Sequence, residues 1–428
     1  MLDKSATIAT EMSMNAAALP TLNHDAGSAP VASLPLQPSP PMQPALETAI
    51  DSRIARVDVY GSFAEAEPHW RALEQPGNFS TPYQAYDFLR LWQEHIGTDD
   101  GVTPCIVVGF NAANTPLFLL PFGRRSLRGL NVVEFLGGKH ANFNMALWRT
   151  DVVAQIGAEA VRATLAHIDA DLAVLASQPV SWAGHGNPFA LLPHQMSPSF
   201  GHSGALQPDF NALFESITSS AARKKLRRKE RILASHGEVR FEQAKGADIQ
   251  AVLADFFEQK TARTRAIGLP DVFSYADVRA FIRAAAETST ADGQPLLELY
   301  TLKINGVIVA TIGGLVAEGR FSAVFISIAH GLYAAESPGQ QLLIHMVRHC
   351  CERGLHTFDL GIGEAKYKDL FCPDAEPMFD SYLPLSASGR RVAFAFRLMA
   401  KAKRAIKQRP ALWSMILKLR RVKARLLG

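Results

Sequence analysis

Apolar positions recur at two spacings between about residue 52 and residue 385. Short apolar runs predict strands, and apolar residues three or four positions apart predict helices. In the first half this pattern predicts strands at 53–60, 104–110, 116–122, 131–138 and 171–177, and helices at 68–75, 81–97 and 156–168. In the second half it predicts strands at 238–243, 296–304, 307–316, 320–329 and 355–360, and helices at 209–235, 247–266, 276–286 and 338–352.

The order of these elements is similar in the two halves. Helices come first, then a hairpin, and then a strand, a helix and a strand. Asn305-Gly306 in the second half is a strong two-residue hairpin signal. The repetition predicts an internal duplication of one α/β unit, with mixed sheets flanked by helices. We expect a first domain at 52–205 and a second at 206–385.

The start of the chain differs in composition from this body. The first 50 residues contain seven prolines and no aromatic residue, so we expect 1–51 to be a disordered lead. It has no compact apolar segment of the signal-peptide kind. No run reaches the roughly 18 apolar residues that a membrane span requires. The four cysteines lack metal-ligand spacing, which is typical of a reducing compartment, and we expect a cytoplasmic protein.

Positive charge is concentrated in two segments. Residues 390–428 contain thirteen Lys or Arg and no Asp or Glu, and residues 223–231 contain seven positive residues. In the tail, 386–428, apolar and basic residues interleave as in helices that lie on an anionic membrane. A helix docked on the body by its apolar face is the alternative. The remaining chain is acidic, so we do not expect general nucleic-acid binding.

The predicted helix at 338–352 has a well-specified start. Ser337 fits the N-cap, Pro338 the first helical position, and Gln340 the capping-box partner. Gly339 lets another group approach the backbone closely. Free N–H groups and a positive dipole end meet there, so the segment predicts an anion site. A helix start that is merely well capped has the same signature.

The segment DLGIGEAKYKDLF, residues 359–371, follows the last predicted strand. Its Gly-x-Gly lacks the third glycine of a dinucleotide fingerprint, which would fall at Lys366. Gly361 and Gly363 instead let the chain leave the strand with little steric restriction.

Together, the hairpin, the following strand, the Ser-Pro-Gly helix start and the Asp-x-Gly-x-Gly segment with its Tyr-Lys cluster resemble GNAT-superfamily acyltransferases of the CelD-like cellulose-biosynthesis type. The basic helix SAARKKLRRKERIL and the segment FSTPYQAYDFLRLWQEHIG are also similar to that family. The resemblance spans about 52–410 and implies a duplicated GNAT-like fold. The two-unit architecture is also similar to Fem-type peptidyltransferases, which use aminoacyl-tRNA in place of an acyl thioester.

The resemblance implies a donor site in the second unit. The strand at 323–328 would carry a bulge whose backbone amides polarise the acyl carbonyl, beside splayed strands where donor and acceptor meet. The residues implied to contact acyl-CoA are Ile326, Ser327, Ile328, Ser337, Gly339, Gln340 and Gln341. The usual GNAT helix start has more glycines than the single one here. Tyr367 matches the tyrosine that protonates the departing thiolate.

An attacking amine must lose a proton, so a nearby carboxylate or histidine is the expected base. Glu364, Asp359 and His330 are the candidates. Each has a structural alternative: Asp359 could cap the following turn, Glu364 could pair with Lys368, and His330 could be a surface loop residue.

Other polar residues are weaker candidates. His140, Asn142 and Asn144 could line an acceptor cleft between the halves, or satisfy loop backbone groups. His345 and His349 lie four apart on one predicted helix, but without the glutamate of H-E-x-x-H, so we expect no metal site.

These observations predict an acyl-CoA-dependent N-acyltransferase without metal, with acyl-CoA as co-substrate. The acceptor is expected to be an amine, or a hydroxyl, on a small molecule or an envelope or polysaccharide precursor; the CelD-like resemblance alone points to the latter. Peripheral contact of residues 390–428 with the inner face of an anionic membrane is an open alternative. The alternatives are a Fem-like aminoacyl-tRNA-dependent transferase and a noncatalytic membrane-surface scaffold.

Overall fold

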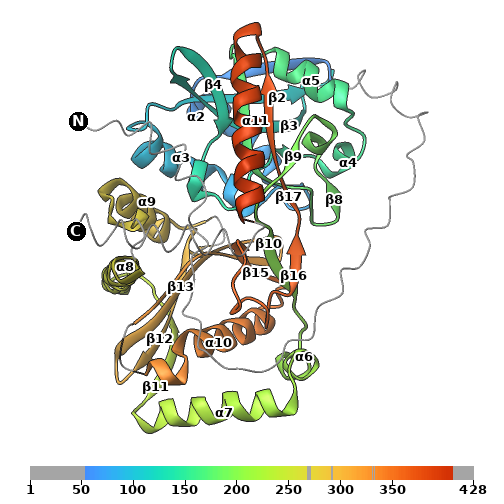
Figure 1. The fold of residues 1–428 in the computed structure, drawn as a ribbon. Helices are drawn as coiled ribbons and strands as arrows, with labels where there is room; N and C mark the ends of the chain where they lie inside the picture. The colour runs from blue at the N-terminus through green and yellow to red at the C-terminus, as the bar shows by residue number, and fades with distance from the viewer. Residues whose placement is uncertain (1–53, 268–270, 291–292, 330, 332, 408–428) are drawn as a thin grey trace.

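The computed structural model describes residues 54–267, 271–290, 293–329, 331 and 333–407. Two lobes lie one above the other, each built around a sheet (Figure 1). The expected disordered lead, 1–51, and residues 408–428 of the expected basic tail lie outside the described residues.

The first sheet has eight strands in the order β1-β2-β3-β4-β6-β17-β9, with β5 paired to β3. Neighbours are antiparallel except β4 and β6. The strands are β1 (Arg56–Tyr60), β2 (Thr103–Phe110), β3 (Pro116–Leu127), β4 (Leu130–Phe135), β5 (Leu147–Trp148), β6 (Leu172–Pro179), β9 (Gln195–Met196) and β17 (Met378–Pro384). A separate two-stranded ribbon joins β7 (Ser181–Trp182) and β8 (His185–Gly186).

The second sheet has seven strands in the order β11-β12-β13-β14-β15-β10-β16, and its one parallel pair is β14 and β15. The strands are β10 (Gly201–Ala205), β11 (Val239–Gln243), β12 (Glu298–Ile304), β13 (Val307–Ala317), β14 (Arg320–Ile328), β15 (Thr357–Ile362) and β16 (Asp374–Glu376). Asn305 and Gly306 join β12 to β13 with φ of 49° and 80°, as the predicted two-residue turn requires.

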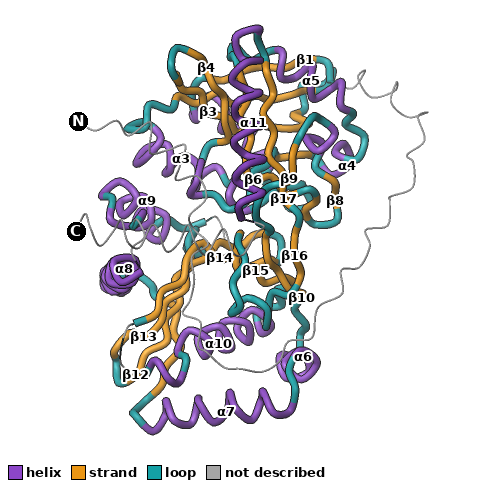
Figure 2. The backbone as a smooth tube through the Cα atoms, viewed as in Figure 1, coloured by secondary structure: helices purple, strands orange, loops and turns teal. Residues whose placement is uncertain are grey.

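Helices cover both faces of the second sheet. Figures 1 and 2 show α8 and α9 on one side and α10 on the other, with α6 and α7 beyond α10. The helices are α2 (Phe63–Leu73), α3 (Tyr86–Trp92), α4 (Thr150–Val153), α5 (Ala158–Ala166), α6 (Phe210–Ile217), α7 (Ser220–Ser235), α8 (Asp248–Ile267), α9 (Ala276–Glu287), α10 (Pro338–Glu352) and α11 (Ala387–Lys407). Short 3-10 or π turns occur at Pro82–Gln84, Gln93–Gly97, Gly138–His140, Pro188–Leu191, Val272–Ser274 and Ala334–Glu336.

The two halves exchange strands. Strand β10, which ends the expected first domain, pairs with β15 in the second sheet. Strand β17, which belongs to the expected second domain, pairs with β6 in the first sheet. The expected boundaries at 205 and 385 therefore do not separate the two sheets, because each half supplies a strand to the other.

One hydrophobic core also runs through both lobes. Side chains of α8 and α9 belong to the same buried cluster as those of the first sheet. At the junction the Phe88 ring, on α3, meets the Phe281 ring, on α9, with 5.1 Å between centroids. A second cluster lies between the other face of the second sheet and α6, α7 and α10. The first half therefore helps to position the second sheet.

Helix α11 crosses the first sheet (Figure 1). Its Ala393 is buried against β6 and β17, and Val392 and Phe396 pack beside it. Within Ala387–Lys407 the structure thus shows a helix docked on the body by an apolar face.

Candidate active site

Strands β14 and β15 separate after a short contact, and the candidate site lies in the gap. They pair only from Arg320 with Thr357 to Ser322 with Asp359. Strand β10 pairs with the opposite edge of β15, from Thr357 to Ile362, and β15 has no partner in β14 beyond Asp359. The rest of β14 therefore leaves the parallel pair, and its backbone borders the gap on that side.

A β-bulge lies in β14 where the strands diverge. In the ladder with β13, Phe325 is opposite Gly313 and Ala323 is opposite Gly314. Val324 is left without an opposite residue, and a bulged residue has backbone groups outside the regular ladder. The second unit therefore contains a bulge within 323–328, where the resemblance implied one.

A small cavity of about 100 Å³, open to solvent, occupies the gap. The implied donor residues Ile326, Ser327 and Ile328 line it, and so does Tyr367. Its full lining is Asn142, Lys260, Arg263, Phe273, Ala323, Val324, Phe325, Ile326, Ser327, Ile328, Leu360, Ile362, Gly363, Ala365, Tyr367 and Lys368. The walls thus come from β14, from the segment after β15, from α8 and from the first half.

The first half holds the backbone beside the bulge. Asn142 Nδ2 donates to the Ala323 carbonyl over 3.1 Å, and the Tyr83 hydroxyl donates to it over 3.4 Å. Gly361, at φ 71°, leaves room for Asn142, because a Cβ there would lie 2.6 Å from the amide nitrogen. The C=O and N–H of a trans peptide point in opposite directions. These contacts therefore also fix the direction of the Val324 N–H.

Tyr367 follows β15 and is half-buried. Burial raises the pKa of its hydroxyl to about 12, and the Arg263 charge acts in the opposite direction. The hydroxyl consequently keeps its proton at neutral pH and can act as a donor toward the cavity that the residue lines.

Three cationic side chains line the same cavity. Lys260 and Arg263 come from α8, and Lys368 comes from the segment after β15. Burial lowers the pKa of Lys260 and of Lys368 to about 8, and it also lowers the pKa of Arg263. Lys368 Nζ donates to the carbonyls of Gly361 and Ile362 over 3.0 and 3.2 Å. Lys368 thus also fixes the backbone at the end of β15.

Asp359, a predicted base, does not line the cavity. It is fully buried and accepts hydrogen bonds from Arg320 Nε over 2.8 Å and from the Ser322 hydroxyl over 2.6 Å. It also accepts from the Gly361 N–H over 2.7 Å, the turn contact that was its structural alternative. These donors occupy the carboxylate.

Of the other two predicted bases, Glu364 is also absent from the described cavity wall. Glu364 is exposed and accepts from the Phe200 N–H over 3.3 Å. His330 lies outside the described residues. Among the residues that the structure describes, no Asp, Glu or His lines the cavity.

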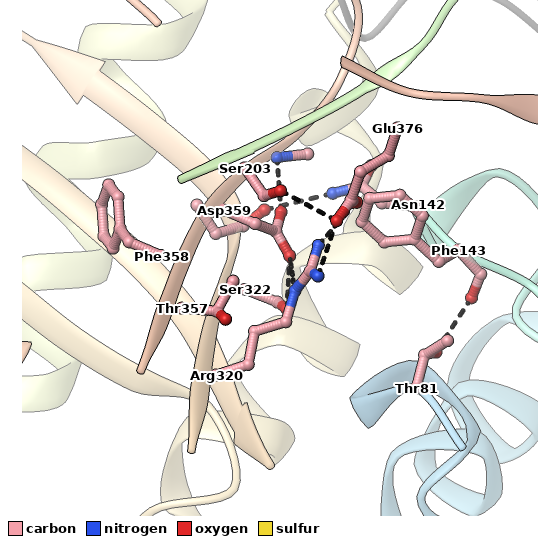
Figure 3. Close-up of polar contacts among 12 residues, drawn as sticks. Thr81, Asn142, Phe143, Ser203, Arg320, Ser322, Thr357, Phe358, Asp359 and Glu376 are labelled. Carbon is pink, nitrogen blue, oxygen red and sulfur yellow. Dashed lines mark hydrogen bonds and ion pairs between the residues drawn. The ribbon is translucent and has the colours of Figure 1, made fainter. Parts of the chain in front are cut away.

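Arg320 fixes the point at which the strands begin to diverge (Figure 3). Besides Asp359, its guanidinium contacts both carboxylate oxygens of Glu376, on β16, over 2.9 and 2.8 Å. Ser203, on β10, donates to Glu376 over 2.8 Å. The guanidinium also lies 3.9 Å from the ring centroid of Trp182, in the first half. This buried network joins β10, β14, β15 and β16 to the first lobe.

The start of α10 differs from the predicted capping box. Ser337 adopts a left-handed conformation, with φ 56° and ψ 63°, and its side chain caps no amide. An N-cap needs an extended backbone to direct its side chain at the first turn. The Ser337 hydroxyl instead accepts from Lys229 Nζ, on α7, over 2.6 Å. The basic helix therefore reaches the start of α10.

Most amides of the first turn of α10 are unavailable to an anion. Gln340 and Gln341 both donate to the Ser337 carbonyl, over 2.9 and 3.2 Å. Pro338 has no N–H. Of the residues implied to bind the donor at this start, Ser337 and Gly339 are left as those whose amides the described contacts do not use.

Two residues of this turn, Gly339 and Gln341, contribute to the packing of α10. A Cβ on Gly339 would collide with the side chain of Ile328, on β14. Gln341 is buried, and its Nε2 donates to the Leu226 carbonyl, on α7, over 3.3 Å. The glycine therefore allows α10 to approach β14.

Of the three residues considered for an acceptor cleft, Asn142 alone lines the cavity. His140 accepts from Trp92 Nε1 over 3.0 Å, and burial lowers its pKa to about 3. Asn144 donates to the Ala176 carbonyl over 3.1 Å. His140 and Asn144 thus serve the interior of the first lobe.

The described residues contain no group of three or more His, Cys, Asp or Glu placed to hold a metal ion. His345 and His349 pack beside the Phe241 ring. The four cysteines are buried and form no disulfide. No described helix is long and apolar enough to cross a membrane.

Residues 220–369 match the family model described as an acetyltransferase (GNAT) domain. The second half therefore contains a GNAT domain. The match includes β14, α10, β15 and Tyr367. The first sheet repeats the arrangement of the second, with a parallel pair, β4 and β6, followed by an exchanged strand. The predicted duplicated GNAT-like fold is confirmed, whereas the match does not test the CelD-like type.

Comparison with curated proteins gives no match. Among solved structures the chain is similar to L-PGS from Bacillus licheniformis, at 12% identity and TM-score 0.43, over 74% of this chain and 95% of that one. FemX gives 11% identity and TM-score 0.49 over 77% and 97%. A tandem GNAT protein from the clavulanic acid biosynthesis pathway gives 11% and 0.41 over 77% and 99%. At these values the three structures say nothing about the activity of this chain.

Sequence reasoning missed four residues around the GNAT cavity: Lys260, Arg263, Tyr83 and Arg320. The first two lie on a helix whose polar positions resemble any solvated face. Tyr83 and Arg320 acquire their roles through partners far away in the chain. No local signal marked them.

Proposed function

We propose that the protein transfers an acyl group from acyl-CoA to an amine. The observation that carries this proposal is the gap between β14 and β15, where the bulge at Val324 and the hydroxyl-bearing Tyr367 border one cavity. The GNAT match over 220–369 supports the same reaction class.

In this reaction the neutral amine attacks the thioester carbonyl carbon and the C–S bond breaks. Backbone N–H groups at the bulge stabilise the negative charge that develops on the carbonyl oxygen. Tyr367 donates its proton to the departing thiolate and regains one from the attacking nitrogen. The products are an amide and the free thiol, and no covalent enzyme intermediate forms.

The start of α10 and its neighbour α7 would hold the phosphates of the donor. Lys229 contributes a positive charge at this point, and Gly339 contributes an amide. The dipole of α10 favours an anion at the same end. The acyl arm would then extend along β14 past Ile328, Ser327 and Ile326, which line the cavity.

A second candidate is transfer from an aminoacyl-tRNA, whose ester carbonyl would undergo the same attack. The observation that favours it is the exposed basic surface of α7, formed by Lys224, Lys225, Arg227, Arg228 and Arg231. This helix lies beside the proposed phosphate site, and a row of cations fits a nucleic-acid backbone.

The test is calorimetric titration of the full chain with CoA, acetyl-CoA and a long-chain acyl-CoA, and separately with charged tRNA. Lys229→Gln is the test variant. Lys224→Gln is the matched control, because it removes an exposed charge from the same helix. We expect acyl-CoA to bind and Lys229→Gln to weaken binding roughly ten- to a hundredfold, the value of a hydrogen bond to a charged group.

Two results would redirect the proposal. Binding of charged tRNA without binding of any thioester would favour the aminoacyl donor. If neither charged tRNA nor any thioester binds, the noncatalytic scaffold is the remaining hypothesis. In that role, substitutions at Tyr367 change no biological output.

A further inference from the structure

Lys260 and Arg263 present two cations on one wall of the cavity. They are three residues apart on α8, and residues at this spacing lie on the same helix face. Both are partly buried and line the same space as Tyr367. Lys260 lies beside two aromatic rings, 5.4 Å from the Phe273 centroid and 6.0 Å from the Phe256 centroid.

Neither cation has an anionic partner in the described part of the chain. No ion pair joins Lys260 or Arg263 to a carboxylate there, and Asp271, whose charge Lys260 senses, lies outside the described cavity wall. Withdrawing a cation from water without pairing it costs free energy. An anion from outside the chain would supply the partner that both cations lack among the described residues.

We propose that Lys260 and Arg263 bind an anionic group, a phosphate or a carboxylate, of the acceptor. The inference rests on the proposed acyl transfer and adds to it the class of acceptor. The donor phosphates are assigned elsewhere, because α8 and the start of α10 lie on opposite faces of the second sheet (Figures 1 and 2). An acceptor anion on α8 would place a nearby amine in the gap that Val324 and Tyr367 border.

The test uses one matched pair of amines, glucosamine 6-phosphate and glucosamine, with inorganic phosphate as a third probe. Each is titrated calorimetrically into the full chain and into Lys260→Gln, Arg263→Gln and the double variant. Arg265→Gln is the control, because Arg265 is exposed near the same end of α8. Acetyl-CoA is titrated into every variant in parallel.

We expect phosphate and glucosamine 6-phosphate to bind the wild type more tightly than glucosamine does. Each single variant should weaken the binding of the two anions roughly ten- to a hundredfold. Arg265→Gln should bind both anions with wild-type affinity. The affinity for acetyl-CoA should stay the same in every variant. The proposal is overturned if the anions bind the wild type and the double variant with equal affinity, or if they bind neither protein. If the variants instead weaken the binding of acetyl-CoA, the two cations bind the donor, and the proposal also fails.

A failure of the proposed function looks different. In that case acetyl-CoA does not bind the wild type, whereas anions still bind and still depend on Lys260 and Arg263. The anion site would then stand without the acyl-transfer reaction.

A second, independent inference concerns the outer face of α11. Phe394, Leu398 and Met399 are 69%, 59% and 53% exposed. Arg391 and Lys401 are exposed as well, and the spacing Arg391-Phe394-Leu398-Lys401 places apolar residues and flanking cations along one helix stripe. The opposite face is already packed on the first sheet.

We infer that this stripe lies on an anionic membrane surface. The charge argues for that occupant, because residues 386–428 contain no Asp or Glu. Apolar side chains with adjacent cations are the composition that binds the headgroup region of anionic lipid.

Co-sedimentation with vesicles tests the inference. We compare phosphatidylcholine vesicles with vesicles that also contain phosphatidylglycerol, using the wild type, Phe394→Ser/Leu398→Ser, and Val307→Ser as the control, since Val307 is 63% exposed at a distant hairpin. Salt-sensitive binding to the anionic vesicles that only the double variant loses is the expected result. Binding unaffected by the double variant, no binding at all, or a concentration-dependent dimer that the double variant abolishes would each overturn it.

Discussion

Among the residues that the structure describes, Tyr367 is the one ionisable residue predicted from the sequence for catalysis that lines the cavity. Its raised pKa keeps the proton available for transfer to a thiolate. Because a positioned acid contributes about 10²- to 10⁴-fold in rate, Tyr367→Phe should lower kcat for thiol release by a factor in that range. The acyl-CoA dissociation constant should change less than twofold, since the ring remains. A variant with full kcat would remove Tyr367 from the mechanism.

Lys260 predicts a pH dependence of anion binding. Burial lowers its pKa to about 8, and the Arg263 charge adds to the lowering. The amine is therefore charged below pH 8 and neutral above it, so affinity for an anion should fall as the pH rises through about 8. Calorimetry with sulfate, which does not titrate in this range, measures the effect. Lys260→Gln should bind sulfate weakly, and the pH dependence that remains should come from Lys368, which lines the same cavity and whose pKa burial also lowers to about 8.

At the scale of elements, the buried pair Arg320 and Asp359 holds β14 and β15 together before they diverge. Asp359→Ala would leave Arg320 paired with Glu376 but would remove the buried acceptor of Arg320 Nε, the Ser322 hydroxyl and the Gly361 N–H. At about 1–3 kcal/mol for each buried donor left unsatisfied, the total cost is about 3–5 kcal/mol. We expect Asp359→Ala to lower the free energy of unfolding by that amount. Glu364→Ala, at an exposed position of the following segment, should stay within about 0.5 kcal/mol of the wild type. Urea unfolding midpoints compare the two.

At the scale of the whole molecule, the exchanged strands and the shared core predict one cooperative unit. Residues 206–385 alone would lack β10 and would lose the partner of β17. The cluster that includes α8 and α9 would also face water. We expect the full chain to unfold in one transition by near- and far-UV circular dichroism, and the isolated second half to show no cooperative transition. Two separate transitions in the full chain would contradict this expectation.

The sequence by itself determined most of the long elements and their order. Local patterns suffice for this, because apolar periodicity and a turn signal such as Asn305-Gly306 act over a few residues. The sequence did not predict β10, β16 or β17, and the single helix predicted at 209–235 is divided into α6 and α7. The duplication followed from the same patterns, and the fold class was predicted correctly. Tyr367 and the bulged strand line one cavity, and the role of Tyr367 as the acid stays a prediction.

The tertiary structure decided what depends on partners distant in sequence. Strand exchange places β10 and β17 in each other's sheets, and no local pattern specifies which of two similar edges a strand joins. The same holds for Ser337, whose predicted cap role gave way to a contact with Lys229 on another helix. Lys260 and Arg263 form a site only because α8 packs beside β14. Through-space pairing, unlike helical or strand periodicity, is set by the packing of the whole chain.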